Sequence, residues 1–169
     1  MDAATLRAAQ APLKEAYRDD PTTALRTLHA EGELQPDGLI CAVTTDIGIA
    51  GAGLHPATGG DGTAVCSGDM LLQALVACAG VTLAAVATAM GIAIRGGTVR
   101  ASGDLDFRGT LGVDKAAPVG FTDIRLEFDV QTDADAQQIE TLLKLTERYC
   151  VVYQTLAGTP RIEASIKTG

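Results

Sequence analysis

The chain has little of several features that would assign it to a large functional class. Only 13 of its 169 residues are Lys or Arg, against 21 Asp and Glu, and the basic residues are scattered along the sequence. Because nucleic acids are bound through clustered positive charge, we expect no nucleic-acid partner. The 4 cysteines are too few and too dispersed for a structural disulfide framework, so any disulfide here is expected to be transient.

Several site signatures are missing as well. The glycines at 51, 53, 59 and 60 are accompanied by no Walker lysine, so they do not form a nucleotide-binding loop. The spacing of His55, Cys66, Asp69 and Cys78 matches no standard zinc pattern. We therefore expect no metal and no cofactor. The N-terminal residues show no basic segment followed by an apolar run, which predicts a cytoplasmic protein.

One apolar segment, from Met70 to Ile94, is long enough to cross a bilayer at about 1.5 Å per helical residue. It is rich in Ala, Val, Gly and Thr rather than Leu, Ile and Phe, it contains Gln73, and amphipathic strands follow it directly. A helix that is apolar on every side is also typical of the centre of a fold. We expect a buried central helix and no membrane partner.

The remaining hydrophobic pattern predicts a helical arm over residues 1–22 and a single domain over residues 23–169. Within this domain we expect a hairpin between 24 and 49, an irregular glycine-rich connection over 48–68, strands near 93–107 and 120–131, a helix after Asp135 and a last strand over 161–167. The connections are of the hairpin kind rather than crossovers. The predicted fold class is therefore α+β, with antiparallel sheet packed on helices.

Two cysteines in unlike surroundings, Cys78 in the apolar helix and Cys150 near the end of the next helix, are the strongest chemical candidates. If the fold brings them together, one thiolate can attack an oxidant and the other thiol can convert the resulting sulfenic acid to a disulfide. Each could also be a small packing residue. A mid-helix thiol needs a nearby cation for activation, and Arg148 and Arg26 are the candidates.

Three further residues are weaker candidates. His55, in the glycine-rich loop, could hold a proton near the thiol or be a surface histidine. Asp69 could orient a cation or simply suit the start of a helix, where a carboxylate is favoured. Cys66, close to Asp69 in sequence, is an alternative second thiol or a bystander, and Cys41 has no role that we can assign.

Two segments carry a family resemblance. The run from Ser67 to Leu83, SGDMLLQALVACAGVTL, resembles the first cysteine helix of the OsmC/Ohr family, and ERYCVVYQTL at 147–156 is similar to its second cysteine segment. The strand LDFRG at 105–109 also fits, and the likeness runs from about Ala24 to the C-terminus.

The resemblance implies an OsmC-like fold, in which antiparallel sheets from two subunits wrap around two central helices in an intertwined homodimer. It also implies a thiol-dependent peroxidase for organic hydroperoxides, and possible action on hydrogen peroxide, in oxidative stress defence. By the same likeness, Cys78 is the peroxidatic cysteine, Cys150 the resolving one, and a dithiol the reductant. The other function that we weigh is a non-enzymatic OsmC-like protein, with an interfacial pocket for a small apolar ligand.

The chain also departs from the family pattern. Where the peroxidase subgroup has a Glu ten residues before the first cysteine, this chain has Gly68 followed by Asp69. The predicted first strand ends in Ala30, Glu31 and Gly32, where that subgroup has an Arg, and Val151 follows Cys150 where many members have Pro. These departures define a divergent branch of the family and leave the binding protein as the alternative.

Overall fold

A computed structural model describes residues 2–34, 39, 41–45 and 48–168. The chain begins with helix α1 (Ala3–Asp19) and the 3-10 turn η1 (Pro21–Ala24). The strands are β1 (Gly32–Leu34), β2 (Cys41–Thr45), β3 (Gly48–Gly53), β4 (Val65–Cys66), β5 (Gly96–Leu105) and β6 (Phe121–Gln131). The turn η2 (Pro56–Thr58) and helices α2 (Ser67–Met90), α3 (Phe107–Thr110), α4 (Ala136–Tyr149) and α5 (Val151–Ala157) complete the order. The α+β class is therefore confirmed.

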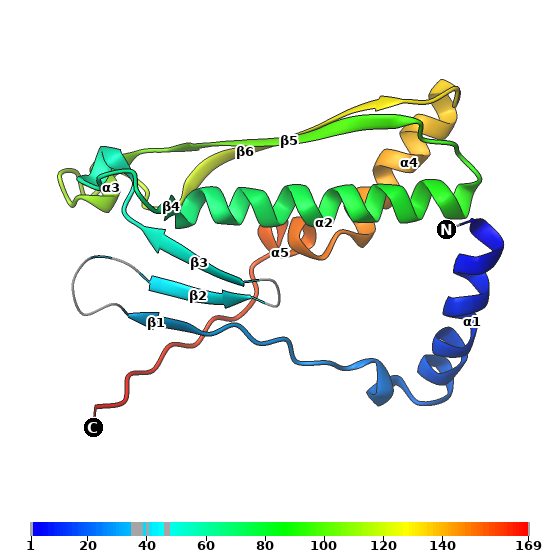
Figure 1. Ribbon diagram of the computed structural model, residues 1–169, viewed down its shortest axis with the longest axis horizontal. Helices are drawn as coiled ribbons and strands as arrows, with labels where there is room; N and C mark the ends of the chain where they lie inside the picture. The colour runs from blue at the N-terminus through cyan, green and yellow to red at the C-terminus, as the bar shows by residue number, and fades with distance from the viewer. Residues whose placement is uncertain (1, 35–38, 40, 46–47, 169) are drawn as a thin grey trace.

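The strands form two separate sheets. One has the order β1-β2-β3-β4, antiparallel except for the parallel pair β3 and β4, and the other is the long antiparallel pair of β5 and β6. In Figure 1 the β5–β6 pair runs along α2, whereas β1, β2 and β3 extend away from it. The helix α1 lies at the far end of α2, near Met90.

The hydrophobic core lies between α2, α4 and the inner face of β6. Leu83, Ala87, Ile92 and Leu142 are buried in it, and Phe128 and Val130 of β6 pack against them. Alternate residues of β6 face inward, as the period of two in its sequence predicts. The helix α4 begins at Asp135 with a capping box that pairs this residue with Gln138, which confirms the predicted helix start.

The helix α2 is present as predicted, and within the single chain one of its faces is buried. By length and composition it could span a membrane, and 28% of its most apolar window is buried. Leu75, Ala79, Leu83 and Ala87 are its buried residues, one every fourth position along a single face. The β5–β6 pair, α4 and α5 cover that face, while Val81 on another face is 73% exposed.

Three predicted boundaries also need correction. Residues 25–31 form no strand, and the hairpin begins only at Gly32, because β2 pairs with Gly32–Leu34. Part of the connection predicted to be irregular, Gly48–Gly53, is the strand β3, since pairing with β2 outweighs its turn-forming composition. The last predicted strand, over 161–167, is extended but unpaired within this chain, and Ile162 and Ile166 are exposed.

Candidate functional site

Cys78 lies in the fourth turn of α2, one turn beyond the buried Leu75. It neighbours the buried face of the helix without being part of it, and its side chain is half-buried. The helix is continuous through this position because Ala and Leu dominate it, and both are good helix formers. Cys78 therefore combines a rigid backbone with partial access from solvent.

Cys150 occupies the junction of two helices. Its backbone N–H donates to the Thr146 carbonyl oxygen at 2.9 Å and ends α4, while its own carbonyl oxygen accepts from the Gln154 N–H at 2.9 Å in α5. Its Sγ accepts from the Tyr153 N–H at 3.5 Å, so the thiol is the side-chain N-cap of α5. The residue is 1% exposed. Cys150, predicted to lie just past the second helix, is thus fixed by backbone hydrogen bonds to both α4 and α5.

The structure brings the two thiols together. Burial raises the pKa of the Cys78 thiol, but hydrogen bonds from the Val152 N–H, the Cys150 thiol, the Val151 N–H and the Thr82 side chain outweigh it, so that this pKa lies below its ordinary value. The backbone donors belong to the first turn of α5, where N–H groups lack helical partners. These N–H groups lower the pKa of the Cys78 thiol, an effect that the sequence had led us to expect from a nearby cation.

The pKa of the Cys150 thiol moves in the opposite direction. Burial raises it most, the hydrogen bond and charge of Cys78 raise it further, and the Tyr153 N–H only partly offsets them. The pKa of Cys78 therefore lies below that of Cys150, and Cys78 is the more readily ionised thiol of the pair.

The two arginines proposed as activators lie elsewhere. Arg148 is exposed, with its guanidinium carbon 5.8 Å from the centre of the Tyr149 ring. Arg26 is exposed as well and donates to the Leu25 carbonyl oxygen at 2.7 Å. Neither contributes to the lowered pKa of Cys78. Within the described part of this single chain, neither arginine is brought to Cys78, and the expectation of a cationic activator stays a prediction.

His55, Cys66 and Asp69 gather at a different place, the N-terminal end of α2. They line a cavity of about 310 Å³. The His55 Nδ1 accepts from the Ala57 N–H at 3.0 Å, and its ring stacks on Phe107 with the centroids 4.8 Å apart. Asp69 precedes Cys78 by nine helical residues, a rise of about 14 Å. The structure therefore does not bring these three residues to the thiol pair.

Sequence reasoning missed α5 and Thr82. The Thr82 hydroxyl donates to the Cys78 carbonyl oxygen at 2.7 Å, one turn along α2. The signal for α5 was present in its stop residues Gly158 and Pro160. Cys41 lies half-buried in β2 opposite Ala52, away from the pair. Among the described residues, no three His, Cys, Asp or Glu side chains converge as metal ligands.

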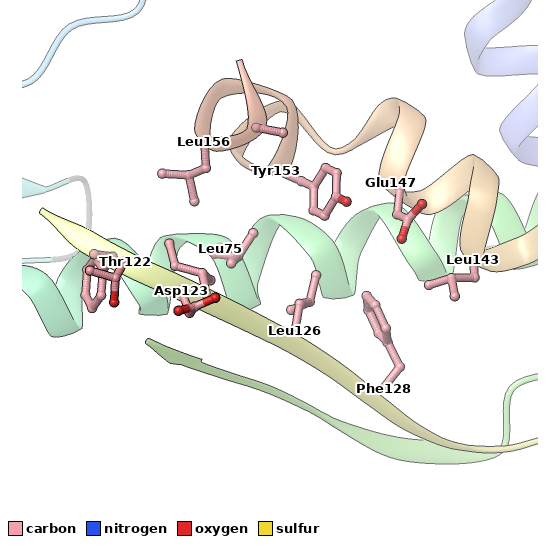
Figure 2. A pocket seen from close by; sticks show the side chains of 12 residues that line it. Leu75, Thr122, Asp123, Leu126, Phe128, Leu143, Glu147, Tyr153 and Leu156 are labelled. Atoms are coloured by element: carbon pink, nitrogen blue, oxygen red, sulfur yellow. The ribbon is translucent and has the colours of Figure 1, made fainter. Parts of the chain in front are cut away.

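A larger cavity has a volume of about 430 Å³, and neither Cys78 nor Cys150 is among its lining residues. It lies between α2, β6 and the helices α4 and α5. Figure 2 shows Leu75 of α2, Leu126 and Phe128 of β6 and Tyr153 of α5 around the same space. The backbone N–H of Tyr153 donates to the Cys150 sulfur, and Leu75 lies one helical turn before Cys78. Two residues of the cavity wall are therefore neighbours of the two cysteines.

These features define an α+β protein with a dithiol site, in which a long helix presents one cysteine to a helix junction built on the other. Residues 60–165 match the family model described as OsmC-like protein. This match covers more than half of the chain and both cysteine segments, and the chain belongs to the OsmC-like family. None of the curated proteins matches the sequence.

Solved structures agree on the fold. An OsmC-like protein from Mycoplasma pneumoniae is 19% identical with a TM-score of 0.66, covering 79% of this chain and 89% of its own. The organic hydroperoxide resistance protein OhrB of Bacillus subtilis is 20% identical with a TM-score of 0.54, covering 79% and 93%. A Vibrio cholerae protein assigned to organic hydroperoxide resistance, with captopril bound in one of its active sites, is 15% identical with a TM-score of 0.53, covering 80% and 88%.

Proposed function

We propose that this protein is a thiol-dependent peroxidase that reduces organic hydroperoxides, with Cys78 as the peroxidatic and Cys150 as the resolving cysteine. The observation that carries the proposal is the contact between the two thiols, with the pKa of Cys78 lowered and that of Cys150 raised. Membership of a family that includes organic hydroperoxide resistance proteins supports it.

In the first step the Cys78 thiolate attacks one oxygen of the hydroperoxide. A sulfur–oxygen bond forms, the oxygen–oxygen bond breaks, and the alkoxide that leaves takes a proton to become an alcohol. Sulfur is oxidised by two electrons and the peroxide is reduced by two. The N–H groups of Val151 and Val152 lower the pKa of the Cys78 thiol and so favour the thiolate that attacks.

In the second step the Cys150 sulfur attacks the sulfenic acid on Cys78. A disulfide forms, the sulfur–oxygen bond breaks, and the leaving hydroxide takes the Cys150 proton to become water. The contact between the thiols makes this step intramolecular, so that it outpaces the arrival of an external thiol. A dithiol reductant then restores both thiols by exchange and is itself oxidised to a disulfide.

The second part of the proposal is that the protein acts as a homodimer. The exposed face of α2 around Val81, and the extended segment with Ile162 and Ile166, leave apolar surface open in the single chain. The four-stranded sheet extends away from α2 (Figure 1) and offers further surface. Apolar surface of this extent favours association. A second copy, wrapped as the family resemblance implies, would cover it.

A non-enzymatic binding protein is the second candidate. It is favoured by the cavity of about 430 Å³ and by the distance between the thiol pair and the polar residues His55 and Asp69. Such a protein would keep the family fold and use the cavity for a small apolar ligand.

The two candidates are separated by mixing the protein with stoichiometric cumene hydroperoxide. The peroxidase loses two thiols and releases cumyl alcohol, and peptide mass spectrometry finds Cys78 joined to Cys150. The variant Cys150→Ser stops at a sulfenic acid that dimedone traps on Cys78, and Cys78→Ser does not react.

A matched control is Cys66→Ser, which removes a thiol outside the pair and is expected to react as the wild type does. Four unreacted cysteines in the presence of excess peroxide would contradict the peroxidase and leave the binding protein.

A further inference from the structure

The larger cavity has a chemical character of its own, apart from the thiols beside it. Most of its wall is apolar, with Leu75, Leu126 and Phe128 among the contributors. Its polar side chains include the carboxylate of Glu147 and the phenol of Tyr153, whereas Asp123, also at the wall, belongs to the outward-facing residues of β6. Among the 12 described residues that line it there is no Lys, Arg or His. An apolar wall with a few convergent polar groups is typical of small-molecule sites.

Glu147 is the better placed of the two acids. It is half-buried on the inner side of α4, and no described residue forms an ion pair with its carboxylate or donates a hydrogen bond to it. The hydrogen bond at this residue is made by its backbone carbonyl oxygen, which accepts from the Gln154 side chain at 2.8 Å. Figure 2 places the Glu147 side chain between Tyr153 and Leu143 at the cavity.

Asp123 has one cation in its surroundings. Arg125 lies two residues along β6, outside the cavity wall, and both of its terminal nitrogens bond Asp104 at 2.7 Å. The pKa of Arg125 is raised by Asp104 first and then by Asp123 and Glu127. One guanidinium thus serves three carboxylates, and the cavity keeps a negative field.

We propose that this cavity binds apolar molecules that carry an amine or no charge and rejects their carboxylate counterparts. A carboxylate would enter beside the like charge of Glu147 with no cation on the cavity wall to receive it, whereas an amine would gain a charge-assisted hydrogen bond to Glu147. If the peroxidase function proposed above holds, on which this extension rests, the substrates are hydroperoxides without a carboxylate group.

The test measures binding without chemistry, on the full chain carrying Cys78→Ser, which cannot reduce a peroxide. Decylamine, 1-decanol and decanoate share one alkyl chain and differ in charge, and calorimetric titration gives the affinity of each. We expect decylamine to bind about tenfold more tightly than decanol, the effect of one charge-assisted hydrogen bond, and decanoate to bind most weakly. Decanoate binding as tightly as decylamine would overturn the proposal.

Variants decide whether Glu147 is responsible. Glu147→Gln keeps the shape of the side chain and should reduce the amine preference about tenfold, whereas Glu140→Gln on the same helix should leave it unchanged. An amine preference that survives Glu147→Gln would show non-specific attraction to an acidic protein and would also overturn the proposal. Circular dichroism verifies that each variant is folded.

A parallel assay keeps the two proposals distinct. Linoleic acid hydroperoxide and its methyl ester differ in the carboxylate alone, and we expect the wild type to reduce the ester about tenfold faster at low substrate concentration. If neither is reduced but the amine preference holds in Cys78→Ser, the peroxidase function fails and the binding site stands. If both are reduced at equal rates, the peroxidase stands and the specificity is overturned.

Discussion

The thiols of Cys78 and Cys150 lie close enough that each shifts the pKa of the other, although 72 residues separate them in the sequence. The pairing depends on α4 ending and α5 beginning at the same residue. A break of the helix one residue earlier or later would aim the thiol elsewhere, because successive helical residues are rotated by about 100°.

The first prediction concerns the pH dependence of alkylation. The thiolate fraction of any cysteine rises as the pH rises through its pKa, so a lowered pKa moves the reactivity of Cys78 to lower pH. We expect the Cys78 rate with iodoacetamide to reach half its maximum below the pH found for a free thiol, and Cys150 above it. Mass spectrometry of the modified peptides, sampled from pH 6 to 10, gives both profiles.

Thr82→Val tests the neighbouring hydroxyl with little change in shape. It should move the Cys78 profile to higher pH, because one of the groups that lower this pKa is gone. Arg148→Ala should leave the profile where it is, since the arginine contacts the Tyr149 ring instead. A large shift in Arg148→Ala together with none in Thr82→Val would reverse this account of activation.

A third prediction separates the capping role of Cys150 from its redox role. Cys150→Ala removes the side-chain acceptor of the Tyr153 N–H and should lower the free energy of unfolding by about 1 kcal/mol, before any loss of packing. Cys150→Ser keeps an acceptor, and serine is a preferred N-cap, so it should retain most of the stability. Urea unfolding of the reduced proteins measures the difference, and equal losses in both variants would speak against the cap.

Core packing supplies a fourth prediction. Leu75 of α2 is 2% exposed and forms part of the wall of the larger cavity. We expect Leu75→Ala to lower the free energy of unfolding by about 2–5 kcal/mol. Leu28→Ala, at a residue that is 89% exposed, should change it by less than about 0.5 kcal/mol. The comparison contradicts the packing described here if the two variants unfold at the same urea concentration.

The last prediction addresses the proposed homodimer. Val81 and Val113 are both 73% exposed, the former on the open face of α2 and the latter in the loop after α3. A charge buried against a second copy is costly, so Val81→Asp should shift the mass measured by analytical ultracentrifugation toward the monomer. Val113→Asp is the matched control. A wild type that sediments as a monomer at micromolar concentration would refute the dimer.

The sequence predicted correctly those features that depend on one helix or strand alone. The period of two in β6 and the cap at Asp135 depend on residues close together in the chain, and both are present in the structure. The strand expected over 161–167 is different, because none of the described residues of this chain pairs with it. The strand β3 was missed since glycine-rich composition is overridden by pairing with β2.

The candidate site shows the same division. Cys78 and Cys150 were identified from their sequence contexts, and their contact could not be, because it depends on how α5 packs on α2. The search for an activating side chain pointed to arginines, while the donors are backbone N–H groups, which have no signature in the sequence. Asp69 was considered for the thiol because the peroxidase subgroup has a Glu near this position, although about two and a half turns of helix separate it from Cys78.

Cys150 ends α4 and caps α5, so its position sets the direction in which the C-terminal part of the chain leaves α4. A disulfide between Cys150 and Cys78 would join this helix junction covalently to the middle of α2, the longest helix of the fold. Local unfolding of α5 would then be rarer in the oxidised form than in the reduced form. Slower amide hydrogen exchange along Val151–Ala157 would therefore report the oxidised state.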